Sequence, residues 1–207
     1  MMAPMTEVLV VRHGETDWNR ERRWQGHGGP GLNERGRAQA HALAARLTGV
    51  KLSAIYTSDL PRAAQTARII GSAVGIEPVP ERGLREVDIG DWRGLTRAEV
   101  RRKNPAGYRR WRRGEAGWKG GETYDEMHAR VVATLERLLQ SHTRGRVLLV
   151  SHGGAVRAIV ARAVDAPRHD RVHIDGADNC SLTTVAATRT ALRLVGFNDV
   201  GHLQGLP

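Results

Sequence analysis

The stretch "EVLVVRHGETDWN" (residues 7–19) begins with apolar residues and becomes polar at Arg12 and His13. A short apolar run that ends in a glycine turn, here at Gly14, predicts a buried strand. Ligands of α/β proteins bind at the carboxyl ends of the strands. A cation beside an imidazole is costly to bury there without a negatively charged partner. The stretch therefore predicts a strand that ends in a binding site for an anion.

A second stretch, "RVLLVSHGG" (residues 146–154), repeats this pattern: an apolar run, then His152, then two glycines. If the two strands are parallel neighbours, His13 and His152 come close together at one edge of the sheet. Glycines such as Gly153 let backbone N–H groups approach an anion, and the helix that follows points its positive N-terminus at the same place. Both stretches therefore predict one shared anion site.

Two arginines are placed to complete this site. Arg12 ends the first strand, and Arg62 lies at the start of a helix after the junction "TSDLP" (residues 57–61). An arginine can bind two phosphate oxygens at once, which a lysine does less well. The pair therefore predicts that the anion is a phosphate group.

Strand-like runs alternate with helix-like segments along most of the chain, which predicts an α/β fold. We expect a three-layer α/β/α architecture, with a mostly parallel central sheet and helices on both faces. The strands are predicted at residues 7–11, 54–58, 146–151, 182–187 and 192–197, and the helices at residues 33–47, 58–75, 122–142 and 154–164. The last two strands are expected to form a hairpin. Residues 88–121, rich in Gly, Arg and Trp, interrupt the alternation, so we expect one domain (residues 1–207) with a cap inserted there.

Composition restricts the class of protein. The 207 residues are 40% hydrophobic and 26% charged, which is typical of a globular chain rather than a disordered or membrane-spanning one. The first residues lack the features of a signal peptide, and the single cysteine, Cys180, excludes an internal disulfide; both favour the cytoplasm. The net charge of +10 permits an acidic partner, either a phosphorylated small molecule or a nucleic acid.

Four motifs together resemble those of the histidine phosphatase superfamily, also called phosphoglycerate mutase-like. They are "RHGET" (residues 12–16), "SDLPRAAQTA" (58–67), "LREVDIGDWRG" (84–94) and "LVSHGG" (149–154). They occur in the family's order and extend over most of the chain. The resemblance is therefore specific, and it favours the phosphatase branch.

The resemblance implies a chemical role for two residues. His13 matches the nucleophile that becomes a phosphohistidine, and Glu86 matches the proton donor of the phosphatase branch. Attack needs a neutral imidazole, and neighbouring arginines favour it by lowering the pKa of His13. A partly buried Glu86 with a raised pKa can give a proton to the leaving group and then accept one from water.

The other matching residues are expected to bind the phosphate group. They are Arg12, Arg62 and His152 in the pocket itself, Asn19 and Gln25 as accessory polar contacts, and Gly153 through its backbone. The resemblance implies no metal ion and no cofactor. Arginine and imidazole groups take the positions that a divalent cation holds in other phosphoryl-transfer enzymes.

Two further motifs have weaker functional interpretations. "GHGGPG" (residues 26–31) has the spacing of a dinucleotide-binding loop, but it does not directly follow a strand and lacks the acidic residue expected about 20 positions later. We expect a glycine-rich loop whose departure from the family's usual "D-x-P-L-T" pattern affects substrate choice. His169 and His173 have a spacing that suits zinc, but without an H-E-x-x-H helix we expect a solvated loop.

The predicted function is a metal-independent phosphomonoesterase that acts on small phosphorylated metabolites through a phosphohistidine. Phosphoryl transfer of the phosphoglycerate mutase type is an alternative, although the chain is short and "VLLVSHGG" departs from the "AHGN" form common in mutases. A second alternative is a non-catalytic module that binds phosphate or nucleic acid, which would not need Glu86 and both histidines. The expected partner is therefore a small phosphate ester, not a nucleic acid or a membrane, and a homodimer is allowed.

Residues 97–121 combine basic with aromatic side chains and follow Glu86 closely. We expect them to cap the site and to select the substrate through Arg109, Arg110, Arg112 and Arg113, which would bind a second anionic group. One alternative is a solvated helix surface, the usual role of a run of charges. The other is a site for single-stranded nucleic acid, in which aromatic rings stack on bases.

Overall fold

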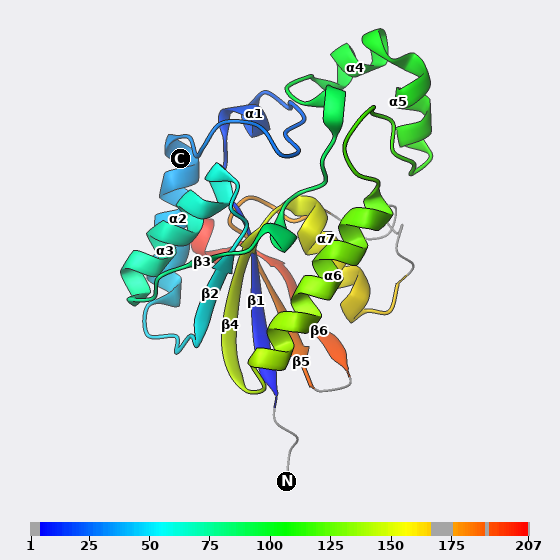
Figure 1. Cartoon of the computed structure of the whole chain (residues 1–207). Helices are drawn as coiled ribbons and strands as arrows, with labels where there is room; N and C mark the ends of the chain where they lie inside the picture. The colour runs from blue at the N-terminus through cyan, green and yellow to red at the C-terminus, as the bar shows by residue number, and fades with distance from the viewer. Residues whose placement is uncertain (1–4, 167–175, 189–190, 207) are drawn as a thin grey trace.

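A mixed sheet of six strands forms the centre of the molecule in the computed structural model, which describes residues 5–166, 176–188 and 191–206 (Figure 1). The strands are β1 (Thr6–Arg12), β2 (Ala54–Thr57), β3 (Val79–Pro80), β4 (Gly145–Ser151), β5 (Leu182–Ala187) and β6 (Leu192–Asp199), in the order β3-β2-β4-β1-β5-β6. The first four pair in parallel, whereas β5 is antiparallel to both β1 and β6. The predicted hairpin is confirmed, and β3 is an edge strand too short to show a sequence pattern.

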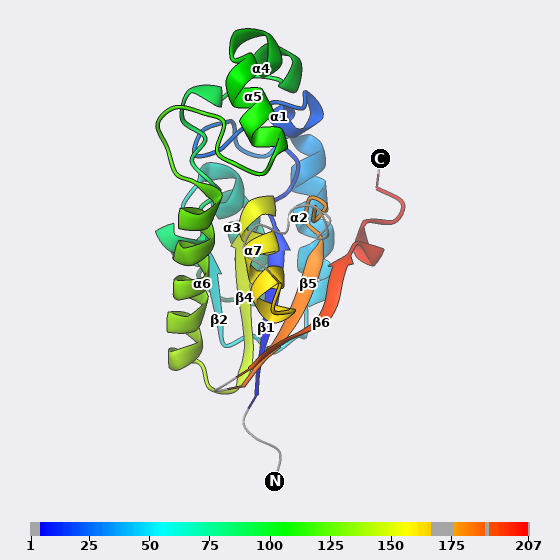
Figure 2. The ribbon, with the colours of Figure 1, turned by 90° about the vertical axis from the view of Figure 1, so that its right-hand side faces the viewer.

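Two long helices cover each face of the sheet (Figure 2). They are α2 (Glu34–Leu47) and α3 (Pro61–Val74) on one face, and α6 (Tyr124–Ser141) and α7 (Gly153–Ala163) on the other. Successive side chains of a strand point to opposite faces. In β1, Val8 and Val10 therefore pack in the cluster of α6 and α7, while Leu9 and Val11 pack in that of α2 and α3. The predicted three-layer α/β/α architecture is confirmed.

Helix α3 begins at Pro61 rather than at the predicted Ser58. Proline is favoured in the first turn of a helix because its missing N–H needs no partner there. Gly75 ends the helix with φ of 73°, a conformation that glycine adopts without strain. Ser58 is left in the junction before the helix, with its hydroxyl close to the candidate site.

Shorter elements from two distant parts of the chain lie above the carboxyl ends of the parallel strands (Figure 1). They are α1 (Asp17–Arg20), α4 (Arg97–Lys103) and α5 (Pro105–Arg112), together with the 3-10 turn η2 (Gly90–Trp92), whereas the 3-10 turn η1 (Arg82–Leu84) lies lower, beside α6. A β-bridge joins Arg23 to Thr96, and Trp24 exchanges backbone hydrogen bonds with Gly94 and Leu95 at 2.8 and 2.9 Å. Residues 17–25 and 94–99 therefore form one connected structure, which we call the upper wall.

Aromatic rings stabilise the region around the upper wall. Trp24, Trp92 and Trp111 pack edge to face with centroids 5.0 to 6.5 Å apart, and Trp118 packs on Trp92 at 5.5 Å. Edge-to-face packing is a favoured geometry for aromatic pairs. Trp92 and Trp118 are buried, so their ring faces contact the protein's own side chains.

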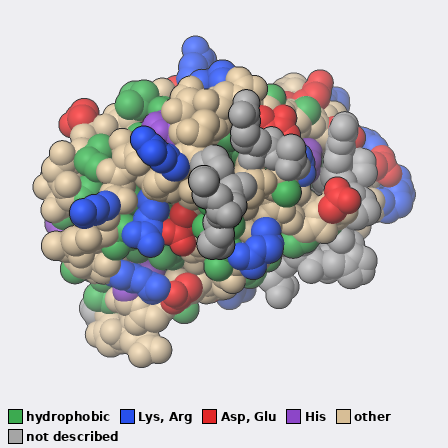
Figure 3. Space-filling model, turned by 90° about the horizontal axis from the view of Figure 1, so that it is seen from below, with side chains coloured by type: hydrophobic (Ala, Val, Ile, Leu, Met, Phe, Trp, Pro, Cys, Tyr) green, Lys and Arg blue, Asp and Glu red, His purple; other side chains and the backbone are tan. Residues whose placement is uncertain are grey.

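The end of the molecule opposite α4 and α5 carries both signs of charge. Figure 3 shows basic and acidic side chains interspersed on this end, without one continuous basic patch. The positive net charge is therefore not gathered there. Among the helices in the described ranges, none has the length and apolarity needed to cross a membrane.

Candidate active site

His13 directly follows β1 and is almost completely buried, with 3% of its surface exposed. Its Nδ1 lies 2.7 Å from the carbonyl oxygen of Gly14, and its Nε2 lies 3.1 Å from Nε of Arg62. An arginine N–H can only donate, so Nε2 accepts this bond and carries the lone pair, while Nδ1 carries the proton. The geometry therefore holds a neutral His13 in one tautomer, with its nucleophilic nitrogen facing Arg62.

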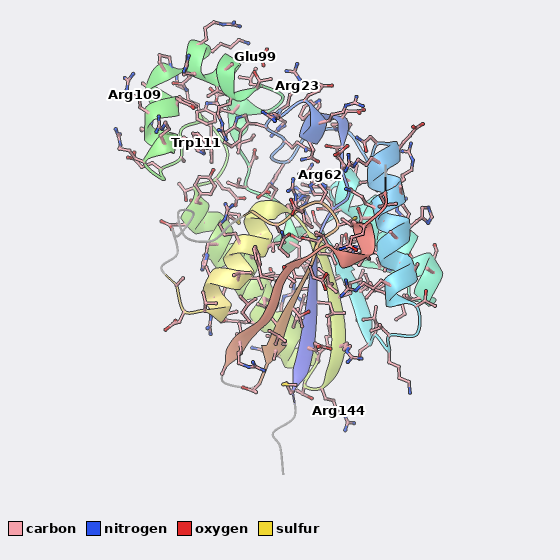
Figure 4. The ribbon with its side chains drawn as sticks, turned by 180° about the vertical axis from the view of Figure 1, so that it is seen from behind. Arg23, Arg62, Glu99, Arg109, Trp111 and Arg144 are labelled. Carbon is pink, nitrogen blue, oxygen red and sulfur yellow. The ribbon has the colours of Figure 1, made fainter. Side chains whose placement is uncertain are left out.

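Arg62 lies in the first turn of α3 and is 1% exposed. Its two terminal nitrogens donate to the carbonyl oxygens of Gly28 and Gly26 at 2.7 and 2.8 Å. Each of these nitrogens keeps a second N–H for a ligand. Figure 4 shows Arg62 between the sheet and the upper elements. The glycine-rich loop 26–31 thus holds this arginine through its backbone.

His152 directly follows β4 and is fully buried. Strands β1 and β4 are parallel neighbours with Arg12 opposite Ser151, so both histidines leave the sheet side by side. The ring centroids of His13 and His152 are 5.2 Å apart, which confirms the predicted proximity. Nε2 of His152 lies 2.8 Å from Oγ of Ser58, whereas Nδ1 has no hydrogen-bond partner within the described ranges.

Arg12 ends β1 and is fixed by the turn before β5. Its NH1 donates to the carbonyl of Ala177 at 2.6 Å. The Cys180 N–H donates to the carbonyl of Arg12 at 2.9 Å, and the Asn179 side chain donates to that of His13 at 2.8 Å. Nε of Arg12 is buried without a partner in the part of the chain that the structure describes. Such buried donors are rare in proteins, and an anionic ligand would satisfy this one.

The floor of the candidate site is formed by Arg12, His13, Arg62 and His152, and burial controls the protonation of these side chains. Desolvation lowers the pKa of His13 well below its ordinary value, and the charges of Arg62 and Arg12 lower it further. Desolvation and Arg62 likewise lower the pKa of His152. The pKa of Arg62 is lowered to about 10, mainly by burial, so this arginine is still charged at neutral pH. Neutral imidazoles beside buried cations favour the binding of an anion.

Glu86 faces the floor from the loop after η1. Its Oε2 accepts from the Gly154 N–H at 3.0 Å, and its Oε1 accepts from the Val87 N–H at 2.9 Å. Gly154 lies in the first turn of α7, where the helix dipole favours a negative charge. A Cβ atom on Gly154 would lie 2.1 Å from Oε1, so only glycine leaves room for this carboxylate. The helix N-terminus expected to bind the anion thus also binds the protein's own Glu86.

A cavity of about 910 Å³ opens above these side chains. Seven of the eight predicted site residues line it: Arg12, His13, Asn19, Gln25, Arg62, Glu86 and Gly153. His152 lies beneath the lining, against the ring of His13. The structure therefore brings the whole predicted set together around one cavity.

The family model of the histidine phosphatase superfamily (branch 1) matches residues 8–200. The chain belongs to this superfamily. It is 32% identical over 201 residues to phosphoserine phosphatase 1 of Hydrogenobacter thermophilus, which covers 96% of this chain and 95% of that protein. It is also 40% identical over 167 residues to phosphoglycerate mutase-like protein 4 of Arabidopsis thaliana, covering 78% of this chain and 73% of that protein.

A solved structure extends the likeness to the fold. The mycobacterial glucosyl-3-phosphoglycerate phosphatase matches with a TM-score of 0.83 and 31% identity, covering 94% of this chain and 99% of that one. Relatives from Mycobacterium bovis and Mycobacterium tuberculosis, 35% identical over 204 residues, are longer, and the chain spans 55% of their length. The predicted family and fold class are confirmed.

Two accessory residues of this histidine phosphatase are tied to one threonine. Asn19 Oδ1 accepts from the backbone N–H of Thr16 at 3.1 Å and from its hydroxyl at 3.0 Å, which caps α1. Gln25 Nε2 donates to the same hydroxyl at 3.0 Å. The amide of Asn19 keeps its N–H groups for a ligand, because only its oxygen serves the cap.

Four arginines outside the predicted set also line the cavity of this histidine phosphatase: Arg22, Arg23, Arg97 and Arg157. Arg22 is exposed and has φ of 56°, in the left-handed region that an arginine rarely adopts. It forms no ion pair with any described residue. Arg97 lies over the ring of Trp111, 5.3 Å from its centroid. The upper wall therefore presents cations toward the opening.

The expectation that Arg109, Arg110 and Arg112 of α5, and Arg113 directly after it, contact the substrate is wrong, because none of them lines the cavity. Arg109 lies on the outer side of α5 (Figure 4). Arg110 donates to the carbonyl of Gly117 at 3.1 Å, and Arg113 pairs with Glu115 at 3.0 Å. The physical reason is the aromatic cluster, which turns Trp111 inward and the basic side chains outward. Of residues 97–121, only Arg97 and Ala98 line the cavity, together with the preceding Thr96.

Sequence reasoning missed several groups that support the site of this histidine phosphatase, among them Ser58 and Arg130. Ser58 was predicted only as the first residue of a helix, but its hydroxyl lies beside His152. Arg130 resembles any other arginine on the surface of a long helix. The solvated loop expected at His169 and His173 lies outside the described residues. Within those residues, no three His, Cys, Asp or Glu side chains are grouped so that they could hold a metal ion.

Proposed function

We propose that this chain is a phosphatase that hydrolyses small phosphate monoesters through a phosphohistidine on His13. The observation that carries the proposal is the floor of the cavity, where the lone pair of a neutral imidazole lies against one buried arginine and near another. Relatives named as phosphoserine phosphatases and a glucosyl-3-phosphoglycerate phosphatase support this activity. No step requires a metal ion.

In the first step, Nε2 of His13 attacks the phosphorus atom and the bond to the leaving oxygen breaks. The hydrogen bond from Arg62 Nε to His13 Nε2 must first break so that the lone pair is available. A bound phosphate favours this change by accepting hydrogen bonds from the guanidinium. Arg12 and Arg62 then offset the charge on the phosphoryl oxygens in the transition state. The free Nδ1 of His152 donates to the same group if the Ser58 hydroxyl donates to Nε2.

Glu86 serves both steps as the group that moves protons. The carboxylate takes up a proton from solvent as the anionic substrate binds, and it gives this proton to the leaving oxygen as the first bond breaks. It then takes a proton from water, which attacks the phosphohistidine so that the phosphorus–nitrogen bond breaks and phosphate leaves. General acid–base catalysis of this kind contributes about 10²–10⁴ in rate.

The upper wall favours substrates that carry a second anionic group. Arg22 and Arg97 line the cavity away from the floor and are exposed, so they meet the part of the substrate that does not react. Of the residues that line the cavity, only Glu21 and Glu86 are acidic, against six arginines. A carboxylate or a second phosphate is therefore the expected second group.

Phosphoryl transfer of the mutase type is the second candidate, because relatives are named phosphoglycerate mutase-like and probable phosphoglycerate mutase. The same phosphohistidine would then pass its phosphoryl group to another hydroxyl instead of water. Incubation with 3-phosphoglycerate separates the two, since a phosphatase releases phosphate and a mutase yields the 2-isomer. Nucleic acid is not favoured, because Trp118 is buried and Trp111 packs on Trp24 and Trp92 with Arg97 over its ring, which reduces the ring surface on which a base could stack. A cytoplasmic location and a homodimer stay predictions.

The proposal is tested by trapping the intermediate. Rapid acid-free quenching during turnover of p-nitrophenyl phosphate in EDTA should yield a phosphoenzyme that is labile in acid and stable in alkali. His13→Ala should abolish it and lower kcat by on the order of 10⁵-fold, the scale of nucleophile removal in other enzymes. His41→Ala, which changes an exposed histidine on α2, is the matched control and should keep full activity. Substantial activity in His13→Ala would refute the proposal.

A further inference from the structure

The guanidinium of Arg130, in α6, is fully used by hydrogen bonds. Its NH1 donates to the carbonyl oxygens of Gly83 and Arg85 at 2.9 and 3.1 Å. Its NH2 donates to the carbonyl of Glu86 at 3.2 Å and to Oε1 of Glu122, and its Nε donates to Oε2 of Glu122 at 3.2 Å. An arginine has five N–H donors, and these five bonds use all of them.

The backbone that Arg130 holds is the irregular segment that carries Glu86. Four consecutive carbonyl groups, those of residues 83–86, accept hydrogen bonds from side chains. The Ser151 hydroxyl binds the carbonyl of Leu84 at 2.6 Å, and His27 Nε2 lies 2.8 Å from that of Glu86. Residues 83 and 84 end the single 3-10 turn η1, and residues 85 and 86 follow it, so neither a strand nor an α-helix fixes the path of the segment. The path depends on these side chains, and Arg130 binds three of the four carbonyls.

Glu122 keeps the guanidinium of Arg130 in this orientation. Both of its carboxylate oxygens accept from Arg130, and Oε1 also accepts from the Asp88 N–H at 3.1 Å. The Glu122 N–H in turn donates to the carbonyl of Asp88 at 3.0 Å. The two side chains are 27% and 18% exposed, so water screens them only in part. A bidentate arginine–carboxylate pair fixes direction as well as distance.

We propose that Arg130, aligned by Glu122, is a positioning residue that holds Glu86 in the geometry for proton transfer. The inference rests on the proposed function, since it needs Glu86 as the proton donor. Glu86 is held at two groups: its carbonyl by Arg130 and His27, and its carboxylate by the N–H groups of Gly154 and Val87. Without Arg130, the carbonyls of Gly83 and Arg85 lose their side-chain donor and that of Glu86 keeps only His27, so the backbone can rotate the carboxylate away from the leaving oxygen. A lysine at position 130 could not replace the arginine, because its single ammonium does not span three carbonyls and a carboxylate.

The test compares kcat/KM for a poor and a good leaving group, 3-phosphoglycerate and p-nitrophenyl phosphate. An alkoxide needs the proton much more than p-nitrophenolate does. Arg130→Met should lower kcat/KM for 3-phosphoglycerate by about 10²-fold, the cost of a misplaced catalytic group, and that for p-nitrophenyl phosphate by less than about 3-fold. Arg130→Lys keeps the charge and the packing of α6 and should show the same selective loss. The lysine variant replaces the methionine variant in this test if Arg130→Met does not fold.

Arg137→Met is the matched control. Arg137 lies two turns further along α6 and also pairs with a carboxylate in the preceding segment, Glu81, but it does not bind the carbonyls of residues 83–86. Its side chain is 57% exposed. The variant should leave the ratio of the two kcat/KM values unchanged.

A double-mutant cycle with Glu86→Gln decides whether Arg130 acts through Glu86. In the Glu86→Gln background, Arg130→Met should cause no further loss on 3-phosphoglycerate, because effects of residues that act as one unit do not add. Equal losses on both substrates, or a full second loss in the Glu86→Gln background, would overturn the inference. If Glu86→Gln itself affects both substrates equally, the proton-donor assignment fails, and this single variant identifies that failure separately.

Discussion

The floor and the upper wall of the cavity are built in opposite ways. The floor residues are buried, with His13, Arg62 and His152 exposed by 3%, 1% and 0%, and each lies where a strand or a helix of the sheet layers begins or ends. The upper wall consists of short elements that are joined by one bridge, a few backbone bonds and the side chain of Arg23, and its other arginines, Arg20, Arg22 and Arg97, are exposed. Sheet register therefore fixes the positions of both histidines, whereas short and solvated segments line the cavity above them.

The largest expected difference between the two regions is the response of stability to pH. The pKa values of His13 and His152 are lowered in the folded state, mainly by burial, so the unfolded state binds more protons below about pH 6.5. The free energy of unfolding should therefore fall as the pH drops below about 6.5, by up to about 1.4 kcal/mol per pH unit for each histidine. The two histidines together change the unfolding constant by up to about 100-fold per pH unit. Urea unfolding between about pH 5 and 7 measures this slope.

His152→Asn should remove about half of this slope, because one of the two histidines is gone. Arg22→Asn, in the upper wall, should leave the slope unchanged. An unchanged slope in His152→Asn would show that the floor is not held neutral by burial.

The next effect concerns the border between the two regions, where α7 meets Glu86. Gly154→Ala should lower kcat/KM for 3-phosphoglycerate by about 10- to 100-fold, because the new Cβ would lie 2.1 Å from Glu86 Oε1 and displace the carboxylate. Alanine is more favourable than glycine in a helix by about 1 kcal/mol, so the melting temperature should not fall together with kcat/KM. Gly153→Ala adds the same methyl one residue earlier, where the nearest atom is 3.8 Å away, and should cost less. Equal losses in the two variants would contradict this account.

A smaller effect is expected in the upper wall itself. Arg22→Asn should raise KM for 3-phosphoglycerate by about 2- to 5-fold, the range of an exposed ion pair, and leave p-nitrophenyl phosphate unaffected. Asparagine tolerates the left-handed backbone of Arg22, so the change removes charge without adding strain. Arg20→Asn, an exposed change on α1 at a residue that pairs with Asp17 at 3.0 Å, is the control. A rise in KM for both substrates would show that Arg22 does not distinguish them.

The smallest effect is expected on the outer side of α5. Arg109→Ala should change KM for either substrate by less than about 2-fold, as a surface substitution away from the cavity does. The comparison with Arg22→Asn in the same assay separates the arginines that line the cavity from those that do not. A larger rise in KM for 3-phosphoglycerate would bring α5 back into the substrate site.

The floor could be predicted from the sequence because each of its parts is local. An apolar run followed by histidine and glycine marks a strand end, and two such ends on parallel neighbours converge without further information. Arg130 could not be predicted in the same way, because it lies 44 positions from Glu86 and binds backbone carbonyls that carry no sequence signal. The arginines of α5 were misjudged because their direction depends on Trp111 packing against Trp24 and Trp92, a tertiary contact. The two residues of β3 were missed because they are too few for any periodic pattern.

The contact between Arg62 and the loop 26–31 has a consequence for how this enzyme can diverge. Arg62 binds carbonyl oxygens of Gly26 and Gly28, which every amino acid supplies. Side chains at positions 28, 30 and 31 can therefore be exchanged, and the rim of the cavity remodelled, while the arginine below keeps its hydrogen-bond partners. A library randomised at these three positions, with Gly26 and Gly29 retained for their φ of 52° and 99° and His27 retained for its contact with the Glu86 carbonyl, should yield variants that differ in substrate preference and share one rate of phosphohistidine formation. Substitutions in this loop can therefore change the substrate without changing the groups that carry out the reaction.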